Sequence, residues 1–119
     1  MAIAQATLDI ADILRNGSAD AKIGCLTGMG EWQLARDLAA LSAAAETAKW
    51  RYDNKPMRPA TDEDRAKSLF ELDEVPVDAD EANRLFDARS EAVAALHDMY
   101  AGLRERAYEM TALHDYSPS

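Results

Sequence analysis

The sequence contains a single cysteine, two histidines and few aromatic residues, and it has no long apolar run. Because Cys25 stands alone, the chain cannot form an intrachain disulfide, and with two histidines it supplies no Cys/His cluster of zinc-ligand spacing. A run of about eighteen apolar residues is missing, as are the basic start and apolar stretch of a signal peptide. We therefore expect a cytoplasmic protein with no disulfide framework, no metal, no cofactor and no membrane partner.

What the sequence does contain fits one small folded domain. Its 119 residues are 48% hydrophobic and 29% charged, which is ordinary for a globular chain. The formal net charge is −9. Such a charge disfavours direct binding to nucleic acid or to an anionic membrane, because both require a cationic surface. The predicted organisation is a single helical domain over residues 1–119.

Apolar residues recur at helical spacing along most of the chain. Spacings of three and four predict a helix over 3–15, and Ser18 is placed to cap a second, short helix. Two longer seams, which step alternately by three and four residues, predict helices over 31–53 and 79–113. A seam this regular favours packing against a neighbouring antiparallel helix, so these two segments are expected to dominate the fold.

The helix predicted over 31–53 is rich in small side chains towards its end. Alanine favours the helix and also lets a neighbouring backbone approach closely. In the segment 49–52, Trp50 is expected to cover one edge of the bundle, and the cations are expected to form salt bridges rather than to hold nucleic acid. The small residues are Ala43, Ala44, Ala45 and Ala48.

Proline-containing linkers at 53–60 and 73–78 separate the remaining elements. Between them we expect a helix over 61–72 that buries Leu69 and Phe70 with help from Ala66. No alternating run of β-branched residues indicates a strand. The predicted fold is therefore all-α, a small antiparallel bundle of about four to five helices.

Negative charge is concentrated in one part of the chain. Residues 60–81 hold 9 acidic and 2 basic side chains, whereas residues 1–59 hold 7 of each and residues 82–119 hold 6 acidic and 4 basic. Helix capping accounts for part of this excess, but anions at the expected end of the helix over 61–72 oppose its dipole. The candidate partner-binding residues are Asp62, Glu63, Asp64, Glu71, Asp73, Glu74, Asp78 and Asp80.

No set of residues supports catalysis. His97 has Asp98 beside it, but a histidine at the boundary of an amphipathic helix is the simpler interpretation. The glycines of segment 24–30 lack the Gly-Lys-Ser/Thr ending of a phosphate loop, and the Glu-x-x-His motif of di-iron bundles is missing. We therefore predict that the chain is not an enzyme and assign no catalytic or metal-binding residue.

The leading hypothesis is a non-enzymatic, acidic interaction protein whose 60–81 region binds a basic surface on a larger protein, such as a nucleic-acid-binding protein. In size, charge and helical make-up the chain resembles small phage-encoded inhibitors, including some anti-CRISPR proteins that present carboxylates in place of phosphates. No motif carries that likeness. It implies a DNA mimic that blocks a nucleic-acid-binding surface.

The alternative hypothesis is an oligomeric structural or assembly protein, or an accessory subunit of a larger complex. The helix over 79–113 can extend beyond its partners within the chain, and its free end would then form a homodimer or partner surface. A bundle closed within one chain is the competing interpretation. The candidate oligomer interface consists of Tyr100, Leu103, Ala107 and Met110.

Overall fold

The structure is a computed structural model that describes residues 4–68 and 72–115. Within these residues the chain is mainly helical, as predicted, and one short two-stranded sheet interrupts it. The elements in chain order are α1 (Gln5–Asn16), α2 (Ala19–Gly28), α3 (Trp32–Asp53), β1 (Met57–Pro59), α4 (Asp62–Ala66), β2 (Glu74–Pro76) and α5 (Ala79–Asp115).

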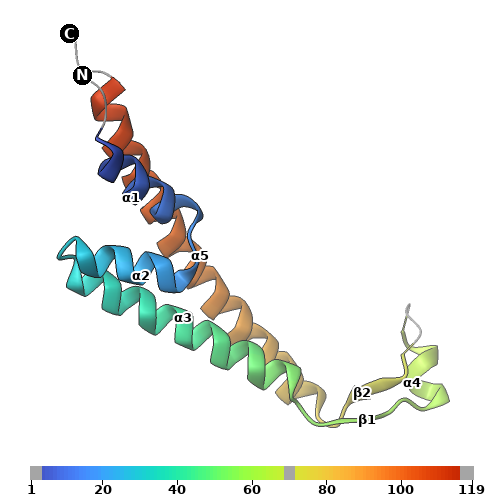
Figure 1. The fold of residues 1–119 in the computed structure, drawn as a ribbon. Coiled ribbons are helices and arrows are strands. Elements are labelled where there is room, and N and C mark those ends of the chain that lie inside the picture. The colour runs from blue at the N-terminus through green and yellow to red at the C-terminus, as the bar shows by residue number, and fades with distance from the viewer. Residues whose placement is uncertain (1–3, 69–71, 116–119) are drawn as a thin grey trace.

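The 37-residue helix α5 forms the spine of the molecule. In Figure 1, α1 lies along its C-terminal part and α3 runs beside its N-terminal part. Two contacts show that α3 is antiparallel to α5. The ring of Tyr52, near the end of α3, lies 5.7 Å from that of Phe86 near the start of α5. At the other end, Glu31 pairs with Arg106. The predicted antiparallel packing of the two longest helices is therefore confirmed.

Helices α2 and α3 form a helical hairpin with a sharp turn. Gly30 has a φ of +80°, a left-handed conformation that favours glycine. The amide of Glu31 donates to the carbonyl of Leu26 at 2.9 Å, which closes the end of α2. At its start, the side chain of Ser18 accepts from the amide of Ala21 at 3.1 Å, so the predicted cap is confirmed.

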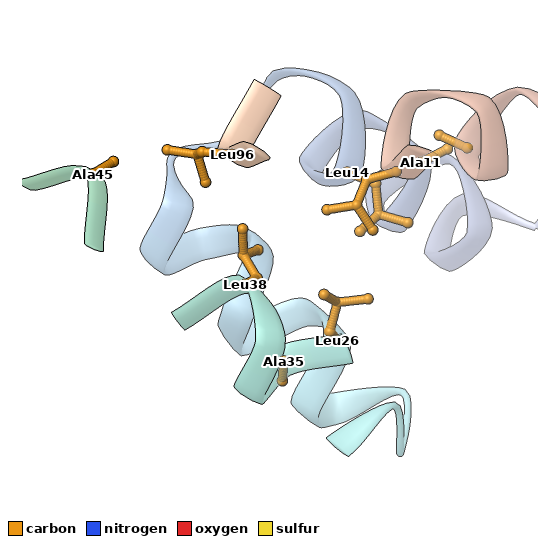
Figure 2. Close-up of a cluster of buried hydrophobic side chains, with 9 residues drawn as sticks. Ala11, Leu14, Leu26, Ala35, Leu38, Ala45 and Leu96 are labelled. Carbon is orange, nitrogen blue, oxygen red and sulfur yellow. The ribbon is translucent and has the colours of Figure 1, made fainter. Parts of the chain in front are cut away.

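The buried side chains form a narrow line rather than a rounded core. Figure 2 shows Ala11 and Leu14 of α1 at one end of this line and Ala45 of α3 at the other. Between them lie Leu26 and Leu38, where α2 meets α3. Each helix is therefore buried on one side only, and its other side faces outward.

The molecule is long and thin. Its extents are 72 × 28 × 17 Å and its radius of gyration is 21.1 Å, compared with about 13.5 Å for a compact domain of this length. It exposes 8462 Å² of surface, whereas a compact monomer of 13.1 kDa exposes about 6,400 Å². The chain thus leaves about 2,000 Å² more surface uncovered than a compact monomer does.

A small tip, made of β1, α4 and β2, extends beyond the ends of α3 and α5 (Figure 1). Here two predictions were wrong. The linkers pair as antiparallel strands, with Arg58 opposite Val75, although no strand was expected. The helix predicted over 61–72 ends at Ala66, which is exposed. The expected burial of Leu69 and Phe70 falls outside the described residues.

Candidate interaction surfaces

Ion pairs within the tip neutralise much of the predicted acidic surface. Asp62 pairs with Arg65 at 3.2 Å, and Glu63 pairs with Lys67 at 3.1 Å. Both pairs join residues one turn apart on α4, and both are exposed, so each contributes little to stability. These carboxylates nevertheless meet cations of their own helix, which reduces the negative field they present to a partner.

Asp64 has a structural role in the tip. Its carboxylate accepts from the guanidinium of Arg58 at 2.8 Å and from the amide and hydroxyl of Thr61 at 2.8 and 2.9 Å. Thr61 in turn accepts from the amide of Asp64, which completes a capping box. The hydrogen bond from Arg58, followed by those from Thr61, holds the pKa of the Asp64 carboxyl well below its usual range.

The other predicted partner-binding residues are spread over several elements. Asp73 precedes β2, Glu74 is its first residue, and both are exposed. The Asp73 carbonyl accepts a hydrogen bond from the amide of Ala60 at 3.0 Å. Asp78 caps α5 by accepting from the amide of Glu81 at 3.1 Å. Asp80 is exposed in the first turn of α5, and Glu71 lies outside the described residues. Capping and ion pairing therefore explain much of the acidic block.

The predicted oligomer interface is an internal surface of the chain. Leu103 is 3% exposed and Ala107 is 0% exposed, because both belong to the core that α1 and α5 share. Tyr100 and Met110 are half-buried and pack against the same core. The helix α1 covers the segment of α5 that was expected to extend freely. Leu103 and Ala107 are therefore covered within the chain, and an oligomer interface formed by these four residues remains a prediction.

A buried lysine of α2 packs against the inward face of α5. The sequence analysis did not predict it. Lys22 of α2 is 6% exposed, and its Nζ donates to the Gly17 carbonyl at 2.8 Å. The same nitrogen lies 4.3 Å above the ring of Tyr100. Burial, and then the nearby charge of Arg104, lower the pKa of Lys22. No apolar pattern marks this position, because the burial of Lys22 depends on where α5 passes.

The outward face of α5 carries a continuous acidic stripe. This stripe is not visible when charges are counted over blocks of the sequence. Its carboxylates recur at spacings of seven and four, which keeps them on one side of a helix. All are exposed, and none makes an ion pair or a side-chain hydrogen bond with the residues that the structure describes. The acidic stripe consists of Asp80, Asp87, Glu91, Asp98, Glu105 and Glu109.

The outward face of α3 exposes two tryptophans and several alanines. Trp32 is 63% exposed and Trp50 is 66% exposed, and they lie eighteen residues apart, which is about five helical turns. Both tryptophans therefore project from the same side of α3. Trp50 was expected to cover an edge of the bundle, but most of its surface is exposed. The outward α3 face consists of Trp32, Arg36, Ala39, Ala40, Ala43, Thr47 and Trp50.

A groove of about 350 Å³ runs beside this face, between α3 and α5. Its walls are mostly methyl groups, since alanines supply most of its lining and Leu85 adds an apolar side chain from α5. Thr47 lines both this groove and a smaller hollow beside Trp50. The alanine groove is lined by Ala43, Ala44, Thr47, Ala48, Arg51, Leu85 and Ala88.

The described residues show no arrangement that suggests catalysis or metal binding. His97 is exposed, with its ring 6.4 Å from that of Tyr100. Cys25 is half-buried, its burial raises the pKa of the thiol, and its Sγ lies 3.9 Å from the sulfur of Met29. Across residues 4–68 and 72–115, no group of three potential metal ligands occurs. Over the same ranges, every helix is too short or too polar to cross a bilayer.

Comparison with known proteins adds no family. No family model, curated protein or solved structure matches the chain. The functional argument therefore rests on the two outward faces, of which one is acidic and the other exposes two tryptophans.

Proposed function

We propose that this protein is a non-enzymatic subunit of a cytoplasmic assembly, and that it acts by presenting the outward α3 face to another protein. One observation carries this proposal: α3 exposes two tryptophans on the side that faces away from the core. Its inward side buries Leu38 and Ala45, while its outward side exposes Trp32 and Trp50. Large aromatic side chains exposed on one side of a helix are typical of a contact surface.

The chemistry of the exposed residues supports the proposal. Tryptophan is enriched in protein interfaces and among the residues that contribute most to binding. The alanines between Trp32 and Trp50 allow another helix to approach closely, because they add little width to α3. Arg36 is the one charged residue of the outward α3 face. This surface is therefore suited to shape-dependent, apolar contact rather than to hydration.

The proposal is tested by affinity capture with the full chain from the cells that produce it. We expect a stoichiometric complex that survives moderate salt and that is lost when Trp32 and Trp50 are both replaced by serine. The matched control replaces Asp87 and Glu105, on the acidic stripe, with serine and should retain the complex. Capture that is unaffected by the tryptophan substitutions would contradict the proposal, provided that circular dichroism shows the variant to be folded.

A second candidate function, binding to a basic surface of a larger protein, is favoured by the acidic stripe of α5. Its carboxylates make no ion pair with any residue that the structure describes, unlike those of α4. Such a surface would steer a cationic partner and could block a site that normally binds nucleic acid. This is the function that the sequence suggested, assigned here to α5 rather than to the tip alone.

The two functions differ in their dependence on salt. Binding through the acidic stripe should weaken steeply as ionic strength rises, because exposed charges are screened. Binding through the outward α3 face should change little. Titration of the captured partner at several salt concentrations therefore separates them, and substitution of Asp87 and Glu105 should abolish only the salt-sensitive component.

A further inference from the structure

We infer that the outward α3 face binds a second copy of the same chain, with Trp50 of each copy seated in the alanine groove of the other. This inference rests on the proposed function and names the partner for the same surface. It begins from the positions of the two complementary features. Trp50 projects from one flank of the outward α3 face, and the alanine groove lies along the other flank.

The projection and the groove lie at the same level along α3. Ala48 and Arg51, which line the groove, bracket residue 50 in the sequence. A twofold axis directed roughly along α3 exchanges the two flanks without changing the level. It therefore brings each Trp50 to the groove of the other copy, in two identical contacts. Such self-complementarity is the condition for a closed dimer in which both chains use the same patch.

The shapes are compatible with this contact. The groove is about 350 Å³ in volume and open to one side, and its methyl-rich walls offer an apolar surface to an indole ring. Thr47 lies between the groove and Trp50, and the charged residues at these two features have opposite signs, since Arg51 lines the groove and Glu46 lines the hollow beside Trp50. Small residues along this side of α3 allow the two α3 helices to come close enough for each Trp50 ring to reach the groove of the other copy.

The elongated chain as a whole exposes enough surface to bury a dimer interface of ordinary size. A standard interface buries about 800 Å² on each partner. The chain exposes about 2,000 Å² more than a compact monomer of its mass, so this burial would cover less than half of the excess. A second copy supplies both the projection and the groove, whereas a foreign partner would have to provide both independently.

The mass of the purified full chain tests the inference. Sedimentation equilibrium should give twice the 13.1 kDa chain mass at high protein concentration. The variant Ala44→Arg fills the groove from an exposed position, and it should raise the dimer dissociation constant about 30-fold or more. The same change at the exposed Ala94 of α5, Ala94→Arg, lies outside the interface and should leave the dimer intact.

Fluorescence gives an independent readout of the Trp50 contact. In the Trp32→Phe variant, Trp50 is the single remaining tryptophan. Its emission should move to shorter wavelength as protein concentration rises, because the ring leaves water on dimerisation. Emission that stays at long wavelength at every concentration, while the protein is dimeric, would overturn the inference.

The failure of this inference can be told apart from that of the proposed function. A wild-type chain that is monomeric at every concentration overturns the dimer. In that case the proposed function still stands if Ala44→Arg loses the partner captured from cells and Ala94→Arg retains it. A dimer that Ala44→Arg leaves unchanged also overturns the inference, since the copies would then associate through another face.

Discussion

The outward faces of α3 and α5 have opposite chemistry, although both helices bury an apolar seam on their inward side. The face of α5 carries six carboxylates and interacts well with water. The face of α3 carries two exposed tryptophans with alanines between them. A helix face that is exposed in the single chain is therefore not always a face that is adapted to solvent. The residue types on the exposed face decide that question, and on α3 they indicate contact with protein.

The same contrast shows how charge is distributed within α5. The acidic stripe faces outward, whereas Arg89 and Arg106 lie beside the inward seam. Arg84 lies on the outward side and pairs with Glu81. Arg89 lies 5.4 Å from the ring of Tyr52, and Arg106 pairs with Glu31. These two arginines connect α5 to α3 and to the residue before it. The carboxylates of the acidic stripe make no ion pair or side-chain hydrogen bond with any residue that the structure describes. A helix with a modest net charge can thus present a strongly acidic face.

Truncating one side chain on each side of α3 should produce the largest difference in stability between two variants. Leu38→Ala removes a fully buried side chain, so we expect the free energy of unfolding to fall by about 2–5 kcal/mol. Trp32→Ala acts on the outward side and should change it by less than about 0.5 kcal/mol. Urea unfolding at low protein concentration measures both. Equal losses for the two variants would mean that the outward face is covered within the chain.

The buried cation beneath α5 should give a smaller, pH-dependent effect. Because the pKa of Lys22 is lowered in the folded chain, the unfolded chain holds this proton to higher pH than the folded chain does. The free energy of unfolding therefore increases as the pH rises towards about 10.5, the ordinary lysine pKa, which means that the folded chain becomes more stable. Wild type should gain stability over this range relative to Lys22→Met, as followed by thermal unfolding.

A control is needed for the loss of one positive charge. The side chain of Lys67 is 75% exposed on the tip, and Lys67→Met removes the same charge away from α5. Its stability difference from wild type should stay nearly constant with pH over the same range. If the stability difference from wild type changed with pH in the same way for both variants, the effect could not be assigned to Lys22.

Charge reversal on the outward face of α5 should have the smallest effect on the fold. In the variant Glu91→Lys/Asp98→Lys we expect a change in stability within about 0.5 kcal/mol, since both sites are exposed and make no ion pair within the described part of the chain. The dimer proposed through α3 should persist, as measured by sedimentation. Dissociation of this variant would show that the acidic stripe, rather than the outward α3 face, holds the copies together.

The sequence predicted the helices well because their periodicity is local. Helices predicted over 31–53 and 79–113 are observed as α3 (Trp32–Asp53) and α5 (Ala79–Asp115). The tip was predicted poorly, because its structure depends on pairing between distant segments. The amide of Val77 donates to the carbonyl of Pro56 at 3.0 Å, and strands of three residues are too short to show alternation.

Interaction surfaces were harder to predict than helices. The seam of α5 was correctly expected to be apolar and packed, but periodicity does not tell which element covers it, and α1 covers Leu103 and Ala107. The acidic stripe could have been found from its seven-and-four spacing, but charge counted by block averages over all sides of a helix. The outward α3 face was missed because its alanines were interpreted as helix formers that let a neighbouring backbone approach closely, and Trp50 as a cover for the bundle.

The uninterrupted length of α5 also has a mechanical consequence. A helix of 37 residues spans roughly 55 Å and resists bending. It joins the tip at one end of the molecule to α1 at the other (Figure 1). Whatever binds at these two ends would be held at a fixed separation by a single strut. A chain of only 119 residues can thus serve as a molecular spacer whose reach is set by its backbone geometry.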